Sequence, residues 1–225
     1  METQRSTVQP ASLRSEPLKK RIADILRQKI ISGEYPLGMQ LSEKEIGQEL
    51  DVSRTPIREA LLLLQMEGMV TILPQSGTFV FKPSEEDTVH LCNMRNILEA
   101  AAIRLAAEIQ DKTVFQQLED NIEESGRWLR EGRLEACHGL DTQFHRMLIQ
   151  ASGNPFLIDG YKIISDRLLA LRQLLPLTQK RIASGLKQHK QIVDAIKAND
   201  LSLAEAVVHT HVDNVKRMLL DSISE

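Results

Sequence analysis

The chain has 225 residues, of which 42% are hydrophobic and 26% charged, and its formal net charge at pH 7 is −3. This length suffices for one large or two ordinary domains with hydrophobic cores. No apolar run approaches the ~18 residues of a membrane span, and the polar N-terminus lacks a signal-peptide core, so we expect a cytoplasmic protein without a membrane partner. Cys92 and Cys137 form no CxxC pair, which argues against a disulfide framework and a zinc finger.

The N-terminal part of the chain predicts a tail followed by a helix. Residues 1–14 are polar and are expected to be a disordered tail, and residues 15–82 are expected to form one domain. Residues 18–32 predict its first helix, which glycine and proline between residues 33 and 38 end. The expected buried positions of this helix are Ile22, Ile25, Leu26 and Ile30.

Residues 42–81 predict a winged helix-turn-helix. Ser42 and Glu45 form a capping box at the start of the first helix, and Ser53 caps the second after a three-residue turn. Residues 70–73 and 78–81 predict two strands joined by a turn at residues 74–77. Two short helices with a hairpin are the minimal unit that places one helix in the major groove of DNA.

The second of these helices has the composition of a recognition helix. Ile57, Leu61 and Leu64 recur at helical spacing and should face the core, whereas Arg54, Thr55 and Arg58 lie off this stripe near the N-terminal end. Arginine suits guanine, and threonine suits a phosphate or a thymine methyl group. The alternative is an ordinary amphipathic helix pair with solvated arginines. We predict DNA binding, with affinity set by local arginines and by dimerisation, because residues 1–84 hold only 11 Lys and Arg against 10 Asp and Glu.

The rest of the chain predicts a helical domain over residues 83–225. Pro83 stops the hairpin, and Ser84 caps the next helix. The six expected helices span residues 84–110, 112–131, 133–151, 155–175, 178–198 and 200–222. Long helices with short connections predict an antiparallel all-α bundle whose interior can hold a ligand or a metal. The expected fold class is therefore mainly α, with a small β-hairpin wing.

Four polar side chains occupy positions of this bundle where apolar ones are expected. His189 and His211 lie on apolar stripes of their helices, and Asp141 and His145 lie one turn apart on a third helix. Three imidazoles and a carboxylate form a plausible site for a divalent transition metal, with positions left for water or a ligand. The alternative is that they are hydrogen-bonded core residues. His138 remains a candidate as an extra or replacement ligand.

Taken together, the two halves of the chain resemble the GntR family of bacterial transcription regulators, in the FadR subfamily that has a C-terminal FCD domain. The N-terminal signature comprises residues 41–45 (LSEKE), 52–61 (VSRTPIREAL) and 77–80 (GTFV). The C-terminal signature comprises Arg95-x-x-x-Glu99, Leu105-Ala106-Ala107, Asp141-x-x-Phe144-His145, His189-x-x-Ile192 and His211. The resemblance covers residues 15–222.

The resemblance implies a homodimer that binds a palindromic DNA operator and responds to a small carboxylate or sugar acid. Its implied metal ligands, for zinc first and for nickel or manganese as alternatives, are Asp141, His145, His189 and His211. The implied DNA-binding residues are Lys44, Ser53, Arg54, Thr55, Arg58 and Gly77 at the wing tip. Arg95 matches a position that meets an acidic effector in relatives. The wing departs from the family pattern, because the residue before Gly77 is Ser76 where an arginine is common.

The alternative from another class is a helical-bundle metalloenzyme with an accessory N-terminal domain. A di-iron bundle needs paired Glu-x-x-His motifs, and the chain contains only Glu135-x-x-His138. A mononuclear hydrolase needs a general base beside the metal, and no such glutamate stands next to a histidine of the site. We therefore predict a regulator rather than an enzyme, and repression is the expected sign.

Overall fold

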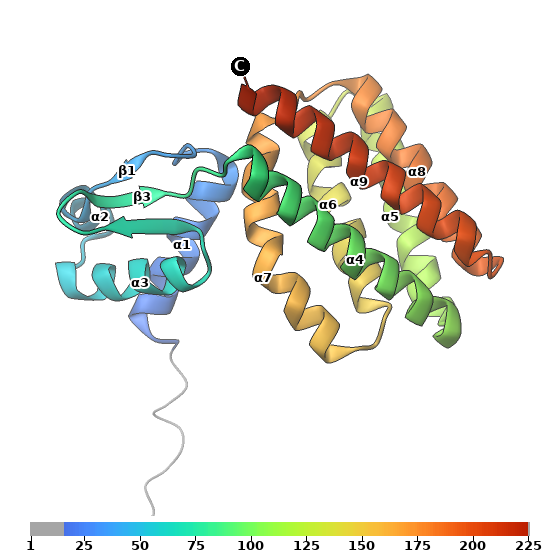
Figure 1. The fold of residues 1–225 in the computed structure, drawn as a ribbon, viewed down its shortest axis with the longest axis horizontal. Helices are drawn as coiled ribbons and strands as arrows, with labels where there is room; N and C mark the ends of the chain where they lie inside the picture. The colour runs from blue at the N-terminus through green and yellow to red at the C-terminus, as the bar shows by residue number, and fades with distance from the viewer. Residues whose placement is uncertain (1–15, 225) are drawn as a thin grey trace, which may run out of the picture. The chain divides into compact units, whose positions relative to one another are not determined.

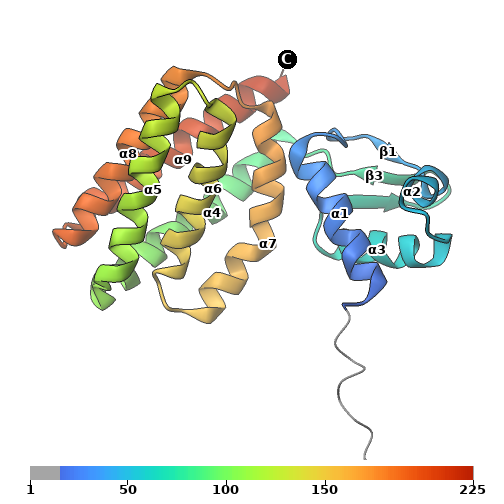
Figure 2. The same ribbon diagram turned by 180° about the vertical axis from the view of Figure 1, so that it is seen from behind.

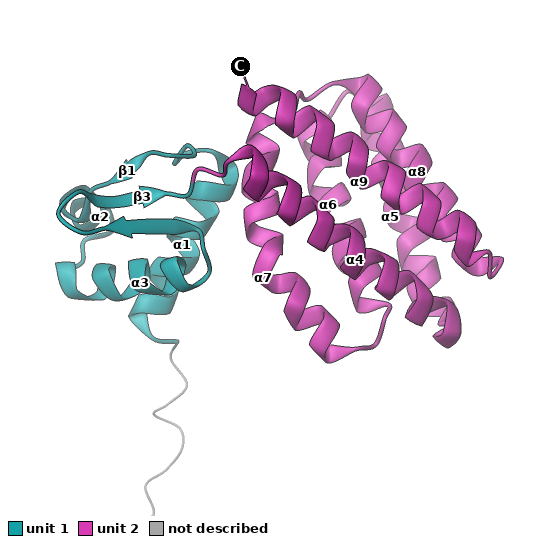
Figure 3. Ribbon diagram, in the orientation of Figure 1, with its two compact units in different colours: residues 1–81 teal, residues 82–225 magenta. Residues whose placement is uncertain are grey.

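The computed structural model describes residues 16–224, which form two compact units that divide between residues 81 and 82 (Figure 3). The tail predicted at residues 1–14 lies outside the described residues. Along residues 16–224, no helix combines the length and the hydrophobicity needed to cross a membrane.

The first unit consists of three helices and a small antiparallel sheet (Figure 1). Its elements are α1 (Leu18–Ser32), β1 (Gln40–Leu41), α2 (Glu43–Leu50), α3 (Arg54–Met66), β2 (Val70–Leu73) and β3 (Gly77–Val80). The predicted helix-turn-helix is confirmed: α2 ends at Asp51 in the left-handed conformation, and α3 begins three residues later. One half of the predicted capping box is present, because the Ser42 hydroxyl accepts the N–H of Glu45. The Ser53 side chain makes no capping hydrogen bond.

The core of this unit lies between α1 and α3. Ile57, Leu61 and Leu64 of α3 are at most 1% exposed, as predicted. The prediction for Ile25 is wrong, because this side chain is 41% exposed. A helix turns about 100° per residue, which puts Ile25 about 60° from Ile22 on the side away from Leu26. Ala23 takes the buried position instead.

The wing contains one more strand than the sequence predicted. The described sheet has the order β1-β3-β2, so the two residues of β1 pair with β3 on the side opposite β2. A two-residue strand is too short to show period-two alternation, which is why the sequence pattern missed it. The strand predicted at residues 78–81 is shifted by one residue, since β3 spans Gly77–Val80.

The second unit is a helical bundle (Figures 1 and 2). Its helices are α4 (Glu85–Ile109), α5 (Lys112–Arg130), α6 (Leu134–Gln150), α7 (Pro155–Leu171), α8 (Gln179–Lys197) and α9 (Leu201–Ser224), with a 3-10 turn, η2, at Arg172–Leu174. α4 packs along α9, and α5 packs against both α6 and α8. The mainly α prediction is confirmed, although α7 ends before residue 175. Leu175 is extended because Pro176 disfavours helical backbone in the residue before it.

The start of α4 shows how locally this bundle is encoded. The Ser84 hydroxyl accepts the N–H of Asp87, and the Asp87 carboxylate accepts the N–H of Ser84, which completes a capping box. Large apolar side chains fill the bundle interior, among them Ile103, Phe144 and Ile192. A cluster of buried polar side chains interrupts this apolar interior.

Candidate functional site

The predicted DNA-binding residues lie on the surface of the first unit. Lys44, Arg54, Thr55, Arg58 and Gly77 are all exposed, and Ser53 is exposed at the start of α3. The Arg58 guanidinium is paired with Glu43 of α2, at 2.8 Å from Nε to a carboxylate oxygen. An exposed pair of this kind is weak and open to exchange with a phosphate.

The wing turn depends on a contact that sequence reasoning missed. Gly77 has a φ of +114°, and a Cβ at this position would lie 2.8 Å from Nε2 of Gln40. Gln40 Nε2 donates to the carbonyl of Ser76 at 3.0 Å and thereby ties β1 to the turn. The wing tip is therefore shaped by its backbone and by Gln40, without an arginine.

In the second unit, three helices bring the predicted metal ligands together. Asp141 and His145 come from α6, His189 from α8 and His211 from α9, and one donor atom from each lies within 4.8 Å of all the others. The imidazole centroids are 4.9 to 5.0 Å apart in each pair of histidines. The three histidines are buried, and Asp141 is partly exposed, so the cluster opens to solvent on the side of the carboxylate.

Two of the histidines are oriented through the ring nitrogen that faces away from the cluster. His145 Nδ1 lies 3.1 Å from both Glu99 oxygens, and His211 Nδ1 lies 3.0 Å from Oε1 of Gln188. A carboxylate and an amide oxygen can only accept, so each Nδ1 donates a proton and each Nε2 keeps its lone pair. Partners of this kind fix the tautomer and ring orientation of metal-binding histidines.

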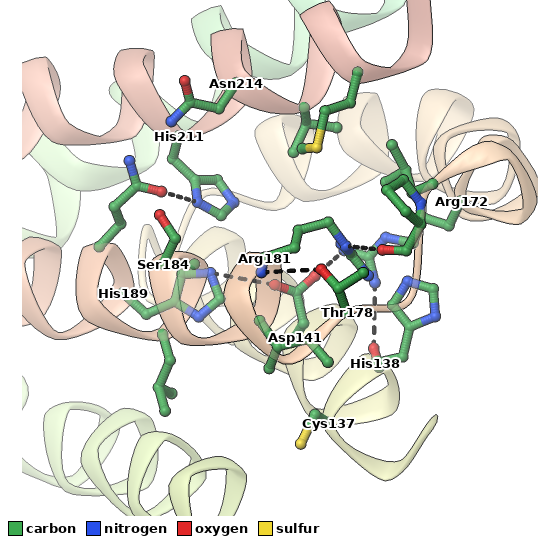
Figure 4. A pocket seen from close by; sticks show the side chains of 18 of the residues that line it. Cys137, His138, Asp141, Arg172, Thr178, Arg181, Ser184, His189, His211 and Asn214 are labelled. Atoms are coloured by element: carbon green, nitrogen blue, oxygen red, sulfur yellow. Dashed lines mark hydrogen bonds and ion pairs between the residues drawn. The ribbon is translucent and has the colours of Figure 1, made fainter. Parts of the chain in front are cut away.

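The carboxylate of Asp141 lies between His189 and Arg172 (Figure 4). Arg172 Nη2 donates to Oδ2, and Oδ1 lies 3.4 Å from His189 Nε2. Burial opposes ionisation of Asp141, but Arg172 and the three neighbouring imidazoles together outweigh it and hold the pKa of Asp141 well below its ordinary range. One carboxylate oxygen is thus engaged with arginine, while the other faces the imidazoles.

The protonation states suit a divalent metal. Burial lowers the pKa of His189 to about 3 and lowers the pKa of His145 and of His211, so the imidazoles are neutral at pH 7 while Asp141 is ionised. Neutral imidazoles and a carboxylate are a donor set typical of zinc and related ions. Among the side chains of residues 16–224, His189 Nε2 is one of the few buried polar atoms without a hydrogen bond. A buried ring nitrogen without a hydrogen-bond partner fits a metal ligand.

Arg95 enters the same cluster from α4. Its Nε donates to Glu99 Oε1 at 2.7 Å, and its Nη2 lies 2.7 Å from Nε2 of His145. Arg95 and Glu99 are both buried. Burial opposes the ionisation of Glu99, but Arg95 and His145 hold its pKa below the ordinary range. Arg95, Glu99 and His145 therefore form a continuous buried chain.

A cavity of about 500 Å³ adjoins the cluster (Figure 4). Its lining includes Asp141, His189, His211 and the guanidinium groups of Arg172 and Arg181. Arg181 Nε donates to the carbonyl of Pro176 at 2.7 Å, but its Nη2 is buried and bonded to nothing in the described part of the chain. The cavity thus combines the four candidate metal ligands with an arginine that lacks an anionic partner among residues 16–224.

His138, the further candidate ligand, lines this cavity but is not part of the four-residue cluster. Burial, together with Arg172 and Arg181, lowers the pKa of His138 to about 4, and its Nε2 makes no hydrogen bond to the described residues. His209 on α9 is exposed. We therefore propose no direct metal contact for either residue.

Sequence reasoning missed the residues that orient and charge the site. Glu99 entered the sequence patterns only as part of a signature, and no pattern singled out Arg172, Arg181 or Gln188. Phe144 was missed in the same way, although its ring stacks on His189 at 3.9 Å and 7°. The one signal in the sequence that could have found such a residue is a charged side chain among apolar ones on the buried face of a helix. This signal applied to Glu99, which is 0% exposed.

Known proteins share both units of this chain. The family model described as "Bacterial regulatory proteins, gntR family" matches residues 18–80, and the model described as "FCD domain" matches residues 90–214. An uncharacterized HTH-type transcriptional regulator of Streptomyces ambofaciens is 32% identical over 198 residues, which cover 86% of this chain and 83% of the relative. The HTH-type transcriptional repressor RspR of Escherichia coli is 28% identical, covering 89% of this chain and 88% of the relative.

A solved structure agrees at the level of the fold. A transcriptional regulator GntR from Rhodococcus sp. RHA1 superposes with a TM-score of 0.75 at 22% identity, covering 90% of this chain and 97% of that one. The helix-turn-helix geometry, the FCD match over more than half of the chain and the regulators among its relatives agree with one another. The chain therefore belongs to the GntR family of bacterial transcription regulators, in the FadR subfamily with a C-terminal FCD domain, and it is a DNA-binding regulator rather than an enzyme.

Proposed function

We propose that the C-terminal bundle of this regulator is a sensor that binds a divalent metal and a small anionic effector, and that the effector modulates operator binding. The observation on which this rests is the convergence of Asp141, His145, His189 and His211 beside a cavity of about 500 Å³. When bound, the metal would supply a positive centre that attracts a carboxylate oxygen. Zinc suits three imidazoles and one carboxylate, and nickel and manganese are the alternatives.

The charges around the cavity favour an acidic effector, such as a carboxylate or a sugar acid. Arg181 presents a buried Nη2 that no described residue accepts from, which is costly unless a ligand pairs with it. Arg172 is already held by Asp141, so Arg181 and Arg95 are the arginines that we assign to the effector. A planar guanidinium pairs well with a carboxylate through two parallel hydrogen bonds.

For the DNA-binding unit we propose contacts from Lys44, Arg54, Thr55, Arg58 and Gly77, with Ser53 at the start of the recognition helix. These residues are exposed on α2, on α3 and at the wing. Because E. coli RspR is described as a repressor, we propose that this regulator represses transcription and that the effector relieves the repression. The function requires access to bacterial DNA, so we assign the protein to the cytoplasm.

We further propose a homodimer that binds a palindromic operator. α4 packs on α7, where Leu98 lies 4.0 Å from the position of a Cβ on Gly160. Next to this junction, large apolar side chains of both helices are exposed: Met94 (39%), Ile97 (63%), Phe156 (86%) and Ile163 (66%). Paired apolar stripes on adjoining helices suit a second copy of the same surface, because a two-fold interface is self-complementary.

The proposed signal path begins at α4. Arg95 and Glu99 lie on this helix, and α4 begins five residues after the end of the wing strand β3. An effector that pulls on Arg95 acts on the helix connected to the DNA-binding unit. Its affinity must differ between the DNA-bound and free states, since otherwise nothing is regulated.

Metal analysis of protein purified without an affinity tag tests the proposed sensor. We expect about one metal ion per chain in the wild type and loss of that ion in His189→Ala and His211→Ala. His209→Ala is the matched control, because this histidine is exposed on α9 two residues before His211. A metal-free wild type, purified without chelators, or unchanged metal content in His189→Ala and His211→Ala would overturn the metal site while leaving the family assignment intact.

A further inference from the structure

The contact between Arg95 and His145 conflicts with metal binding by the same imidazole. Arg95 Nη2 lies 2.7 Å from His145 Nε2, and His145 Nδ1 lies 3.1 Å from the Glu99 oxygens. A guanidinium only donates, so Nε2 accepts from Arg95 and Nδ1 donates to Glu99. An aromatic ring nitrogen has a single lone pair, and here Arg95 occupies it.

That lone pair is also the one with which His145 faces the other ligands. Nε2 of His145 is the ring nitrogen near Asp141, at 4.0 Å from Oδ1, whereas Nδ1 is turned toward Glu99. His145 cannot accept from Arg95 and coordinate a cation through the same electron pair. The positive charge of Arg95 opposes a second cation there as well.

The other polar neighbours of the cluster do not conflict with a metal. Arg172 donates to Oδ2 of Asp141 and leaves Oδ1 facing His189 Nε2 at 3.4 Å. Gln188 accepts from Nδ1 of His211 and leaves Nε2 free. Within residues 16–224, Arg95 is therefore the cation that occupies an electron pair that a metal would need, the one on Nε2 of His145.

The spacing of the four candidate ligands and the space around Arg95 both agree with a site that holds Arg95 in place of a metal. The donor atoms spread over as much as 4.8 Å, whereas opposite ligands at metal bonds of about 2.1 Å are about 4.2 Å apart. Arg95 also borders two openings, the cavity of about 500 Å³ and a smaller one of about 20 Å³ beside Tyr161 and Ser165. The four donor atoms thus lie slightly farther apart than a bound metal requires, and Arg95 has open space beside it.

We propose that Arg95 and the divalent metal exclude each other at Nε2 of His145, so that Arg95 holds the metal-free site together and metal loading frees its guanidinium for the effector. This inference rests on the proposed sensor function and adds a regulatory link to it. In the metal-free state Arg95 is bound to Glu99 and His145, so its guanidinium is not free to pair with an effector in the cavity that it borders. Metal and anionic effector then increase each other's affinity by the same factor, as linkage requires.

The test is the zinc affinity of the metal-free protein, measured without effector by competition with a chromophoric chelator. The informative variant is Arg95→Met with Glu99→Gln, because it removes one buried positive and one buried negative charge together. The amide oxygen introduced by Glu99→Gln still accepts from Nδ1 of His145, so the tautomer is kept. We expect the double variant to bind zinc at least about tenfold more tightly than the wild type.

Glu99→Gln alone is the matched control. It keeps Arg95 and raises the positive charge of the cluster, so zinc affinity should fall below that of the wild type. If the wild type binds zinc but the double variant binds it equally or more weakly, the role proposed for Arg95 is overturned and the proposed sensor function still stands. A wild type that binds no zinc, nickel or manganese would overturn the proposed sensor as well.

A second readout uses the wild-type protein and does not depend on the folding of the variants. A guanidinium held by Glu99 and His145 rotates slowly, so its Nη–H groups should give separate signals in nitrogen-15 spectra of the metal-free protein. One equivalent of zinc should average or remove these signals while the Nδ1–H signal of His145 persists. Arg95 signals that stay unchanged with zinc bound would overturn the proposal.

Discussion

Glu99 and His145 are joined across the bundle interior, with 3.1 Å between Nδ1 of the imidazole and the carboxylate oxygens. Glu99 lies on α4 and His145 on α6, and both are buried. The same carboxylate accepts from Arg95 at 2.7 Å. One acidic group therefore fixes a candidate metal ligand and neutralises a buried arginine.

Glu99→Gln in the metal-free protein should destabilise the bundle by about 3–5 kcal/mol, because Arg95 is left as a buried charge without its counter-ion. Urea denaturation followed by helical circular dichroism measures this loss. The double variant with Arg95→Met should recover a large part of it. Glu205→Gln is the control, since its partner Arg104 is 59% exposed and the pair should contribute at most about 1 kcal/mol. Equal losses in the two single glutamate variants would contradict the buried ion pair.

Gly47→Ala should destabilise the DNA-binding unit, although alanine favours helices. A Cβ on Gly47 would lie 3.0 Å from the carbonyl oxygen of Val52 and 3.2 Å from Cδ1 of Ile57, so α2 and α3 would have to separate. Overpacking of this kind costs about 1–3 kcal/mol. Gly139→Ala in α6 is the matched control, because its Cβ meets nothing within 4 Å and should add about 0.5–1 kcal/mol. Thermal unfolding of both variants measures the expected loss of stability in Gly47→Ala and the expected gain in Gly139→Ala.

Arg54→Ala should strongly weaken specific operator binding and leave metal binding unchanged. Loss of one bidentate base contact costs about 1–3 kcal/mol per site, which in a two-fold complex amounts to about thirtyfold or more in affinity. Fluorescence anisotropy at fixed salt concentration measures the affinity. Lys190→Ala removes one positive charge from α8 of the other unit and serves as the control. Loss of metal together with DNA binding in Arg54→Ala would argue against independent units.

Ile97→Asp and Ile163→Asp should shift the proposed dimer to monomer, because each places a charge in an apolar surface on α4 or α7. Sedimentation equilibrium over a range of concentrations reports the association state. Leu203→Asp on α9 is the control, since this leucine is 48% exposed and lies on a different helix. If all three variants remain dimeric, the α4–α7 surface is not the interface.

The metal-free protein should lose stability as the pH falls from about 6.5 toward 4. Burial lowers the pKa of His189 to about 3, and burial with Arg172 and Arg181 lowers the pKa of His138 to about 4. In this window the unfolded chain binds protons that the folded chain does not, so acid favours unfolding. Each histidine contributes a loss on the order of 3 kcal/mol by pH 4.

Urea midpoints measured across this pH range check the prediction. His138→Gln should make the pH dependence shallower, because it removes one of the histidines that are neutral when buried without opening the metal cluster. His209→Gln should leave the profile unchanged, since that side chain is exposed. A wild-type profile that stays flat from pH 6.5 to 4 would contradict the neutral buried state of these histidines.

The sequence by itself determined the helices, the helix-turn-helix and the four converging candidate ligands. Caps such as Ser84 with Asp87 involve near neighbours, and helical periodicity marks inward positions such as His189 and His211 without knowledge of the partner helix. The exposure of Ile25 and the strand β1 already escaped this reasoning, since they depend on how neighbouring elements pack.

Only the tertiary structure decided how the ligands are held. Arg172 follows α7 and reaches Asp141 on α6, and Arg95 reaches from α4 to His145, so each contact joins residues more than 30 positions apart. Periodicity shows which face of a helix is buried, but it does not show which side chain of another helix lies opposite. That pairing is set by the packing of the helices and by side-chain rotamers, which is why the arginine on His145 became visible only in the folded bundle.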